Sequence, residues 1–191
     1  MGHILVVGGT GMLYDVCRHL CGSVNTVTVI ARNKKRLNRL ALETKELVGS
    51  INPLSLDYAD YEQLKDDLKE SIFTNGPVEL AICWMHTSKA PEAATITAET
   101  IHKQNKQTKC KYYQLLSSAT ADPSHEKRDI FKDFKSLDNI DFRTILLGFV
   151  VEGQTSRWLT DKEICSGVIE AIENDTRNSI IGTVEPWNRR P

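Results

Sequence analysis

The fold is decided by the segment Ile4-Leu5-Val6-Val7-Gly8-Gly9-Thr10-Gly11-Met12-Leu13. Its first half is an apolar run typical of a buried strand, and three glycines follow at once. Glycine permits a tight, sometimes positive-φ backbone, and its missing side chain lets a diphosphate approach the main chain. A helix predicted from about Gly11 to Cys21 would offer that anion unpaired amides and a positive dipole end. The segment therefore predicts a strand, a phosphate-binding turn and a helix; a glycine turn without a ligand is the alternative.

Outward from this segment, the chain alternates between the hydrophobic period of strands and that of helices, which is typical of a parallel sheet with helical crossovers. The expected strands are His3–Val7, Thr26–Ala31, Asn52–Leu56, Val78–Trp84, Lys111–Leu116, Phe142–Val151 and Ser179–Val184. The other helices are expected after Asn33, from Tyr61, near Pro91 and after Thr160. We predict one α/β domain over residues 1–191, with a doubly wound, mostly parallel sheet of about seven strands flanked by helices, the Rossmann-like arrangement.

The last predicted helix has the clearest start signal. Thr160-Asp161-Lys162-Glu163 has the spacing of a capping box, in which the threonine hydroxyl and the glutamate each satisfy an otherwise unpaired amide. The helix that follows is predicted to bury one apolar face, made of Ile164, Val168, Ile169 and Ile172.

Composition narrows the function classes. The 191 residues include 24 basic and 25 acidic ones, so neither nucleic acid nor an anionic membrane surface is expected as the main partner. No apolar run approaches the roughly 18 to 20 residues that span a bilayer, and the N-terminus does not have the pattern of a signal peptide. We expect no metal site and a cytoplasmic protein whose partner is a small-molecule substrate; homodimer formation stays open.

The five cysteines also indicate a reducing compartment. Their number is odd, none forms a CxxC pair, and each falls in a predicted helix or strand. Cys17 and Cys21 share a helix face, where cysteine usually acts as a small buried hydrophobe. All are expected to be free thiols: Cys17, Cys21, Cys83, Cys110 and Cys165.

The glycine segment resembles the GxxGxxG turn of extended and atypical short-chain dehydrogenases/reductases, which are NAD(P)-binding Rossmann-fold proteins. The order of strands and helices extends this resemblance over nearly the whole chain. The third glycine of the family turn falls at Tyr14 here, so the resemblance predicts a wider gap between helix and strand, or a tyrosine ring at the edge of the site. The resemblance implies a cofactor-binding turn made of Gly8, Gly9, Thr10, Gly11, Met12 and Leu13.

The end of the second strand indicates which dinucleotide is bound. An acidic residue there would favour NAD(H), because its carboxylate binds the ribose hydroxyls. This chain has Arg32, whose planar and permanently charged guanidinium suits a 2′-phosphate. We therefore expect NADP(H) rather than NAD(H), held by Arg32, Asn33 and Arg36; a solvated basic helix start is the alternative.

The end of the third strand is expected to contact the adenine. By the resemblance Asp57 takes this role, with Tyr58 along the adenine edge, unless Asp57 is an ordinary turn residue.

The fourth strand leads to the predicted chemistry, since ligands in open parallel sheets lie beyond the carboxyl ends of the strands. His86 is the expected proton donor, because an imidazole titrates near neutrality. A polar residue capping the strand end is the alternative. Trp84 and Met85 are expected either as walls of the nicotinamide or substrate pocket or as core residues.

The family resemblance places a catalytic serine at the end of the fifth strand, which is Ser117 or Ser118 here; simple bonding to nearby backbone is the alternative. It also implies a tyrosine further along with a lysine four residues beyond. No tyrosine follows Tyr113, so this Tyr-x-x-x-Lys motif is absent. His125 and Lys127 lie in the right region without the spacing. Tyr112 and Tyr113 are predicted inside the strand, out of reach of the role.

The segment after the sixth strand is where the resemblance places substrate and nicotinamide contacts. Gly148 is expected to let the cofactor amide approach the backbone. Met85, Phe149, Arg157 and Trp158 are the expected substrate contacts, with Arg157 and Trp158 holding an anionic or planar group. Packing of Trp158 on the helix that follows Thr160 is the alternative.

These observations favour an NADP(H)-dependent oxidoreductase that transfers hydride to a small carbonyl or imine, the cofactor carrying the chemistry. The missing Tyr-x-x-x-Lys motif favours the alternative, a non-catalytic NADP(H)-binding redox sensor or scaffold. A sugar-nucleotide or flavin-related enzyme on the same fold is the third hypothesis.

Overall fold

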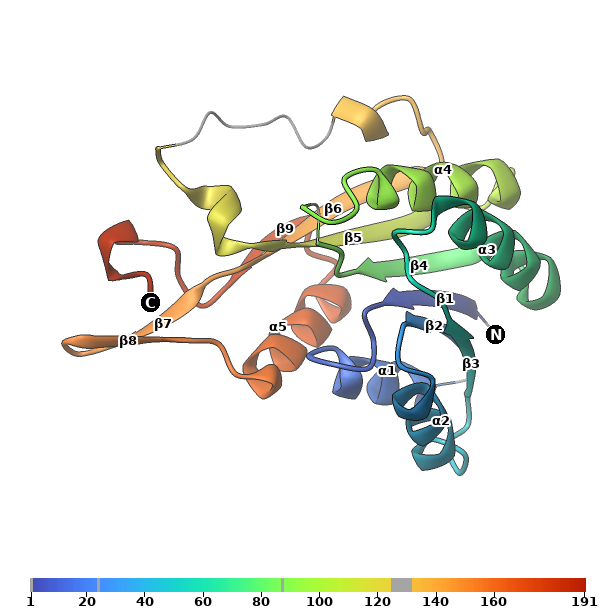
Figure 1. The fold of residues 1–191 in the computed structure, drawn as a ribbon, viewed down its shortest axis with the longest axis horizontal. Coiled ribbons are helices and arrows are strands. Elements are labelled where there is room, and N and C mark those ends of the chain that lie inside the picture. Colours follow the sequence, from blue (N-terminus) through green and yellow to red (C-terminus); the bar gives the residue numbers. More distant parts are fainter. Residues whose placement is uncertain (1, 24, 87, 125–131) are drawn as a thin grey trace.

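A seven-stranded parallel sheet forms the centre of the molecule, in the order β3-β2-β1-β4-β5-β6-β9 (Figure 1). The computed structural model describes residues 2–23, 25–86, 88–124 and 132–191. The strands of this sheet are β1 (Gly2–Val7), β2 (Asn25–Ala31), β3 (Ser50–Ser55), β4 (Val78–Cys83), β5 (Cys110–Ser117), β6 (Ile140–Leu147) and β9 (Asn178–Ile181). The strand order reverses between β1 and β4, which is the doubly wound Rossmann arrangement that the sequence predicts.

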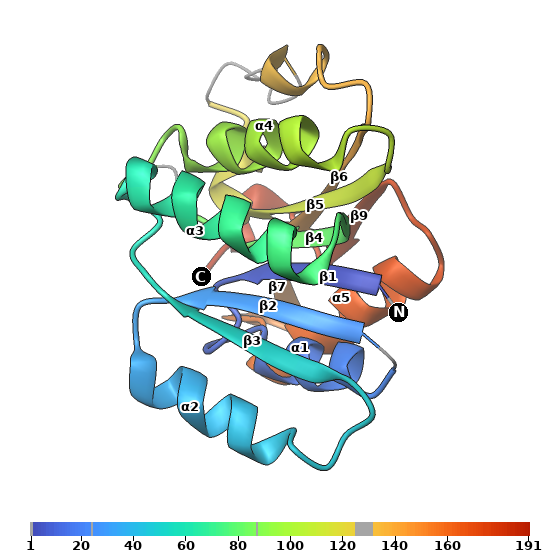
Figure 2. The ribbon, with the colours of Figure 1, turned by 90° about the vertical axis from the view of Figure 1, so that its right-hand side faces the viewer.

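Helices cover both faces of the sheet (Figure 2). Their bounds are α1 (Tyr14–Cys21), α2 (Lys34–Glu43), α3 (Tyr61–Asn75), α4 (Ala93–Asn105) and α5 (Asp161–Glu173). One core cluster joins α1, α2 and α5 to one face of the sheet through residues such as Val16 and Val168. The other joins α3 and α4 to the opposite face through residues such as Leu64 and Ile101. The central strands are buried between these layers, which explains their almost unbroken apolar runs.

The expected sixth strand, Phe142–Val151, is two strands in the structure. β6 stays in the sheet, whereas β7 (Phe149–Glu152) turns away and pairs antiparallel with β8 (Thr155–Trp158). Gly148 makes this break possible, because a Cβ at that position would lie 2.1 Å from the carbonyl oxygen of Thr183. The backbones of Phe149 and Thr183 instead exchange two hydrogen bonds of 2.8 Å. The result is a hairpin that projects beyond the sheet (Figure 1).

The connection from β5 to β6 differs from the other crossovers. Within its described residues, 118–124 and 132–139, it contains two 3₁₀ turns, η1 (Ser118–Ala121) and η2 (Lys132–Phe134), and no α-helix. An aromatic cluster covers the sheet here, with the Phe134 ring centroid 4.0 Å from that of Phe142 and 5.6 Å from that of Tyr112. Tyr112 and Tyr113 are fully buried inside β5, as expected.

Two local predictions meet different outcomes. The capping box at α5 is confirmed, since the Glu163 N–H donates to Thr160 Oγ1 at 3.3 Å and the Thr160 N–H donates to Glu163 Oε2 at 2.8 Å. The first helix was expected from about Gly11, but α1 begins at Tyr14, because the glycine turn extends through Leu13.

The structure can be compared with the expectations that the cysteines are free thiols and that no segment spans a membrane. All five cysteines are free and buried, in agreement with the sequence. Burial raises the pKa of each thiol, so none is an activated thiolate. In the part of the chain that is described, no helix is both long and apolar enough to cross a membrane.

Candidate functional site at the carboxyl edge of the sheet

The carboxyl ends of the strands bring the predicted residues to one edge of the molecule. In Figure 1 the arrow of β4 points to the left, and the β7–β8 hairpin and the C-terminal end lie on that side. His125 and Lys127 are outside the described residues. The candidate site consists of the strand ends, the hairpin and the last residues of the chain.

The three glycines of the turn serve three different purposes. Gly8 has a φ of +84°, which a side chain would strain, and its N–H donates to the Ile30 carbonyl at 2.9 Å. Gly9 is packed against the core, since a Cβ there would lie 2.6 Å from Cys17 Sγ. A Cβ at Gly11 would meet nothing within 4 Å. Only Gly11 therefore leaves open space over the turn.

The turn presents backbone donors without acceptors. Leu13 is the N-cap of α1 and makes no capping bond through its side chain. Across the described residues, the N–H groups of Thr10, Gly11, Met12 and Leu13 make no hydrogen bond. Such a group of amides at a helix N-terminus is a binding site for an anion. One acidic side chain, Asp15, lies in the first turn of the helix, 3.6 Å from Arg18.

Tyr14 does not occupy this space. Its hydroxyl donates to Glu43 at the end of α2, and its ring packs against the core cluster on the α1 face. Burial, and then the bond to Glu43, raise the pKa of Tyr14 to about 12. The expected ring at the edge of the site is therefore replaced by a link between two helices. From the other side, the Cys165 thiol of α5 donates to the Met12 carbonyl at 2.9 Å and steadies the turn.

Arg32 lies at the end of β2 with its side chain 66% exposed. Its Nη1 is 3.9 Å from Asp57 Oδ2 at the end of β3, too far for a hydrogen bond. Asp57 uses its other oxygen to accept the Ala59 N–H at 3.1 Å. Asn33 caps α2, because its Oδ1 accepts the Arg36 N–H at 3.1 Å, and the Arg36 side chain is exposed. The guanidinium of Arg32 is thus free to meet a phosphate.

The end of β4 places an aromatic and an imidazole beside the turn. Trp84 lies against Gly8, since a Cβ on that glycine would be 3.1 Å from the Trp84 carbonyl. The His86 ring packs edge-on against Trp84 at 5.2 Å and is exposed, while its backbone N–H donates to Tyr58 Oη at 3.1 Å. Met85 is only 4% exposed and packs in the core, so it forms no pocket wall. Tyr58 therefore holds the segment that carries His86.

The two serines at the end of β5 are not equivalent. Ser117 is exposed, and its side chain makes no capping bond to η1. Ser118 is 2% exposed, and its Oγ accepts the Nε–H of Arg190 at 2.9 Å. Ser118 thus contacts the last residues of the chain, a partner 72 positions away that the sequence analysis did not single out.

Three of the predicted ligand contacts, Gly148, Phe149 and Arg157, make contacts within the protein at the β7–β8 hairpin. Gly148 and Phe149 are buried where β7 crosses the end of β9, so the glycine accommodates the Thr183 backbone and Phe149 belongs to the core. Arg157 is bound by two carboxylates, with Nε 2.9 Å from Glu152 Oε1 and Nη1 2.9 Å from Glu163 Oε2. The bond to Glu163, and then that to Glu152, raise the pKa of Arg157. These placements argue against Gly148, Phe149 and Arg157 as ligand contacts.

Trp158 is 47% exposed at the end of the hairpin and stacks under Arg190. The C-terminal segment that brings Arg190 there has no role among the sequence predictions. Its composition, Pro186-Trp187-Asn188-Arg189-Arg190-Pro191, holds two cations and an indole in six residues. This concentration of arginine and tryptophan was the one sequence signal for the contacts of Arg190 with Ser118 and Trp158.

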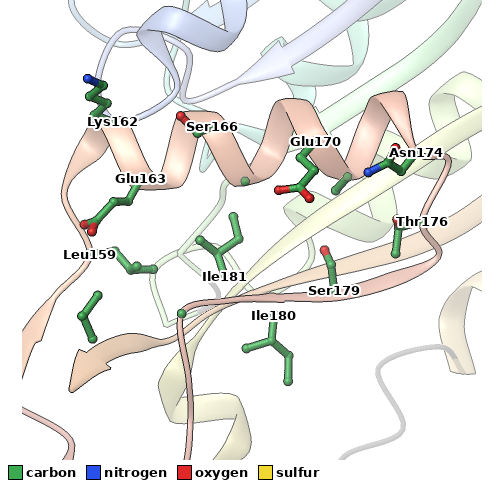
Figure 3. Close-up of a pocket in the computed structure, with 14 residues that line it drawn as sticks. Leu159, Lys162, Glu163, Ser166, Glu170, Asn174, Thr176, Ser179, Ile180 and Ile181 are labelled. Carbon is green, nitrogen blue, oxygen red and sulfur yellow. The ribbon is translucent and has the colours of Figure 1, made fainter. Parts of the chain in front are cut away.

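A groove of about 560 Å³ lies between α5 and β9 (Figure 3). Ser166, Glu170 and Asn174 line its helical side, and Ser179 and Ile181 line its strand side. It is lined by none of the glycine-turn residues, nor by His86 or Ser118, so we do not assign the chemistry to it.

Comparisons with known proteins agree on the fold. No family model matches the chain, and no curated protein matches its sequence. An alcohol dehydrogenase from the archaeon Thermococcus sibiricus, solved with 5-hydroxy-NADP, is 16% identical with a TM-score of 0.74 over 96% of each chain. A short-chain dehydrogenase from Oenococcus oeni is 10% identical with a TM-score of 0.75, covering 99% of this chain and 97% of the other. A short-chain type dehydrogenase/reductase from Mycobacterium marinum is 14% identical with a TM-score of 0.72, covering 97% and 95%. This chain therefore has the Rossmann fold of the short-chain dehydrogenases.

Proposed function

We propose that this chain is an NADP(H)-binding oxidoreductase of the short-chain dehydrogenase/reductase type, in its atypical branch, acting on a small carbonyl or imine. The glycine turn carries the proposal, because four successive backbone N–H groups at the start of α1 lack an acceptor in the described chain. The likeness in fold to a dehydrogenase solved with 5-hydroxy-NADP supports it.

The turn fits a dinucleotide diphosphate. The amides of residues 10–13 supply donors, the dipole of α1 favours a negative charge, and Gly11 leaves the approach free of side chains. Trp84, packed against Gly8, lies next to this position and would contact the cofactor beyond the diphosphate.

The end of β2 fits the additional phosphate of NADP(H). Arg32 is exposed and has only a loose 3.9 Å approach to Asp57, so a phosphate would gain a guanidinium that has no strong partner. Arg36, in the first turn of α2, adds a second cation. Asp57 and Tyr58, at the end of β3, would border the adenine.

The chain's own contribution to the reaction is to bind the substrate and give a proton to it. A bound nicotinamide supplies the hydride. His86 is exposed, stands on a backbone held by Tyr58, and would protonate the nascent alkoxide or amine. The Ser118 hydroxyl accepts from Arg190 and keeps its own hydrogen for a carbonyl oxygen. Ser117, exposed one residue earlier, is the neighbouring donor.

A non-catalytic NADP(H) sensor is the second candidate. It is favoured by the absence of any tyrosine after Tyr113, and by the lack of an α-helix in the described residues between β5 and β6. A Tyr-x-x-x-Lys pair shares one face only on a helix, so this connection offers no support for it within residues 118–124 and 132–139.

Titration with NADPH, NADP⁺ and NADH, followed by quenching of tryptophan fluorescence, tests binding. Oxidation of NADPH with a panel of aldehydes, ketones, oxo acids and cyclic imines then tests turnover. We expect NADPH to bind more tightly than NADH and to be oxidised with at least one substrate class. Tight binding without turnover across the panel would establish the sensor, and failure of all three dinucleotides to bind would reject both candidates.

A further inference from the structure

Arg157 in β8 and Arg190 beside the β7–β8 hairpin differ in whether a carboxylate balances their charge. Arg157 donates to Glu152 and Glu163, so its charge is balanced by carboxylates within the protein. Arg190 is within ion-pair distance of no carboxylate in the described part of the chain. The cation available to an anionic ligand is therefore Arg190, which the sequence analysis did not select.

The guanidinium of Arg190 is held in place by three groups. Its Cζ lies 4.8 Å from the ring centroid of Trp158 on β8 and 5.2 Å from that of Trp187 in η3 (Trp187–Arg189). Its Nε donates to the buried Ser118 Oγ at 2.9 Å. Contacts of this kind fix both the position and the plane of the group.

The neighbouring arginine anchors the segment that carries this group. Arg189 donates through Nη2 to the carbonyls of Gly153 at 2.9 Å and Thr155 at 3.3 Å, at the tip of the hairpin. The C-terminal segment is thereby tied to the hairpin by one arginine and to the end of β5 by the next. Arg190 is thus ordered without any internal counter-charge.

The N–H groups of Arg190 that make no hydrogen bond within the described residues indicate which kind of ligand the guanidinium can bind. Its Nη1 and Nη2 have no acceptor among the described residues, and their N–H bonds lie in the plane of the guanidinium. A carboxylate can pair with such an edge through two parallel hydrogen bonds. Because Ser118 Oγ binds the same guanidinium, a carbonyl directly attached to that carboxylate would lie next to the serine hydroxyl.

We propose that Arg190 binds the carboxylate of a 2-oxo acid, so that the substrate class of this oxidoreductase is 2-oxo acids. The inference rests on the proposed function. The carbonyl carbon receives the hydride from NADPH and its oxygen receives a proton from the protein, giving a 2-hydroxy acid and NADP⁺. The carboxylate is unchanged and serves to orient the carbonyl toward Ser118 and His86.

The test compares acids with their uncharged esters. Pyruvate, 2-oxopentanoate and phenylpyruvate are each measured against the corresponding methyl ester, with wild type, R190M, R190K and, as a control, R177Q. Arg177 precedes β9 at the opposite end of that strand and pairs with Asp141 at 2.9 Å, so the control removes the same charge away from the site. Melting temperatures of all variants report whether the fold is retained.

For wild type and R177Q we expect kcat/KM for at least one acid to exceed that of its ester by about tenfold or more, the scale of a charge-assisted pair. R190M should lose this preference by raising KM for the acid while the ester is unaffected, and R190K should restore part of it. Equal kcat/KM for acids and esters in wild type, or a parallel loss of both in R190M, would overturn the proposal.

A second measurement separates this inference from the proposed function. Trp158 and Trp187 enclose Arg190, so the acids should quench tryptophan fluorescence without any cofactor, whereas the esters and R190M should give no change. If NADPH does not bind but this acid-specific quenching is seen, the oxidoreductase proposal fails and the carboxylate site stands. If NADPH binds but the acids do not quench, or if inorganic phosphate quenches in their place, the carboxylate assignment fails alone.

Discussion

The two halves of the carboxyl edge are built in opposite ways. The glycine-turn half (residues 8–13, 32–36 and 57–58) offers backbone amides and an exposed guanidinium from neighbouring strand ends. The tail half (Ser118, residues 149–158 and residues 186–191) is held together by arginine side chains that contact residues from distant parts of the sequence. Backbone donors suit a constant group such as a diphosphate, whereas a side-chain network can vary with the ligand. Under the proposed function, the glycine-turn half binds the cofactor and the tail half selects the substrate.

His86 follows β4, which lies between β1 and β5 in the sheet, and its replacement should have the largest effect. We expect H86A to lower kcat by about 10²- to 10⁴-fold, because a positioned general acid contributes on that scale. The dissociation constant for NADPH should stay near that of wild type. Steady-state kinetics and fluorescence titration measure the two quantities. H19A, which removes an exposed histidine of α1, serves as the control. Unchanged turnover in H86A would remove this residue from the mechanism.

Arg32 tests the cofactor half alone. R32D should raise the dissociation constant for NADPH by about 10- to 100-fold, because a charge-assisted pair with the 2′-phosphate is lost and a like charge is introduced. NADH lacks this phosphate, so its binding should change little. Comparative titrations of the two nucleotides decide the matter, and an equal loss for both would contradict the assignment of Arg32.

Gly9 and Gly11 distinguish packing from binding within the turn. In G9A the new methyl group meets Cys17 Sγ and Val29 Cγ1 at 2.6 and 2.7 Å, so we expect the free energy of unfolding to fall by about 1–3 kcal/mol. In G11A it meets nothing, and stability should change by no more than about 0.5 kcal/mol, while NADPH binding weakens. Urea denaturation of both variants provides the comparison; equal destabilisation would show that Gly11 is also packed.

Replacement of Glu163, which lies in α5 and bonds Arg157 of the tail half, should give the smallest effect. Its bond from Arg157, and then those from Thr160, lower its pKa to about 2, below its ordinary value of 4.5. A carboxylate with a lowered pKa stabilises the fold above its ordinary pKa and loses that contribution as the pH falls toward about 2. Urea midpoints at about pH 5 and about pH 3 should therefore differ more for wild type than for E163Q. The same difference in both proteins would mean that this pair does not stabilise the hairpin.

The sequence predicts the strands, turn and helices of the glycine-turn half well because their signals are local. The apolar run before Gly8, the turn itself and the cation at Arg32 all lie within single strand–turn–helix units. The capping box at Thr160 is local in the same way, and its hydrogen bonds are those expected from the spacing. Side chains in such units point where the backbone period places them.

The tail half was harder to predict because its contacts are long-range. Phe142–Val151 is a continuous apolar run, and periodicity alone does not show that Gly148 divides it. The sequence assigned Arg157 to a ligand because it could not show that Glu152 and Glu163 balance its charge. The bond from Arg190 to Ser118 depends on how the hairpin and the C-terminal segment fold back over the sheet.

The hairpin has a consequence for how this scaffold diversifies. Its two strands are closed at the base by the Phe149–Trp158 pair and joined at the tip by a turn through Gly153, which has a φ of +58°. Residues beyond that base contribute nothing to the seven-stranded sheet. Insertions or deletions at the tip would reshape the surface beside Arg190 and leave the seven-stranded sheet unchanged, so under the proposed function this architecture can acquire new substrate ranges without refolding its centre.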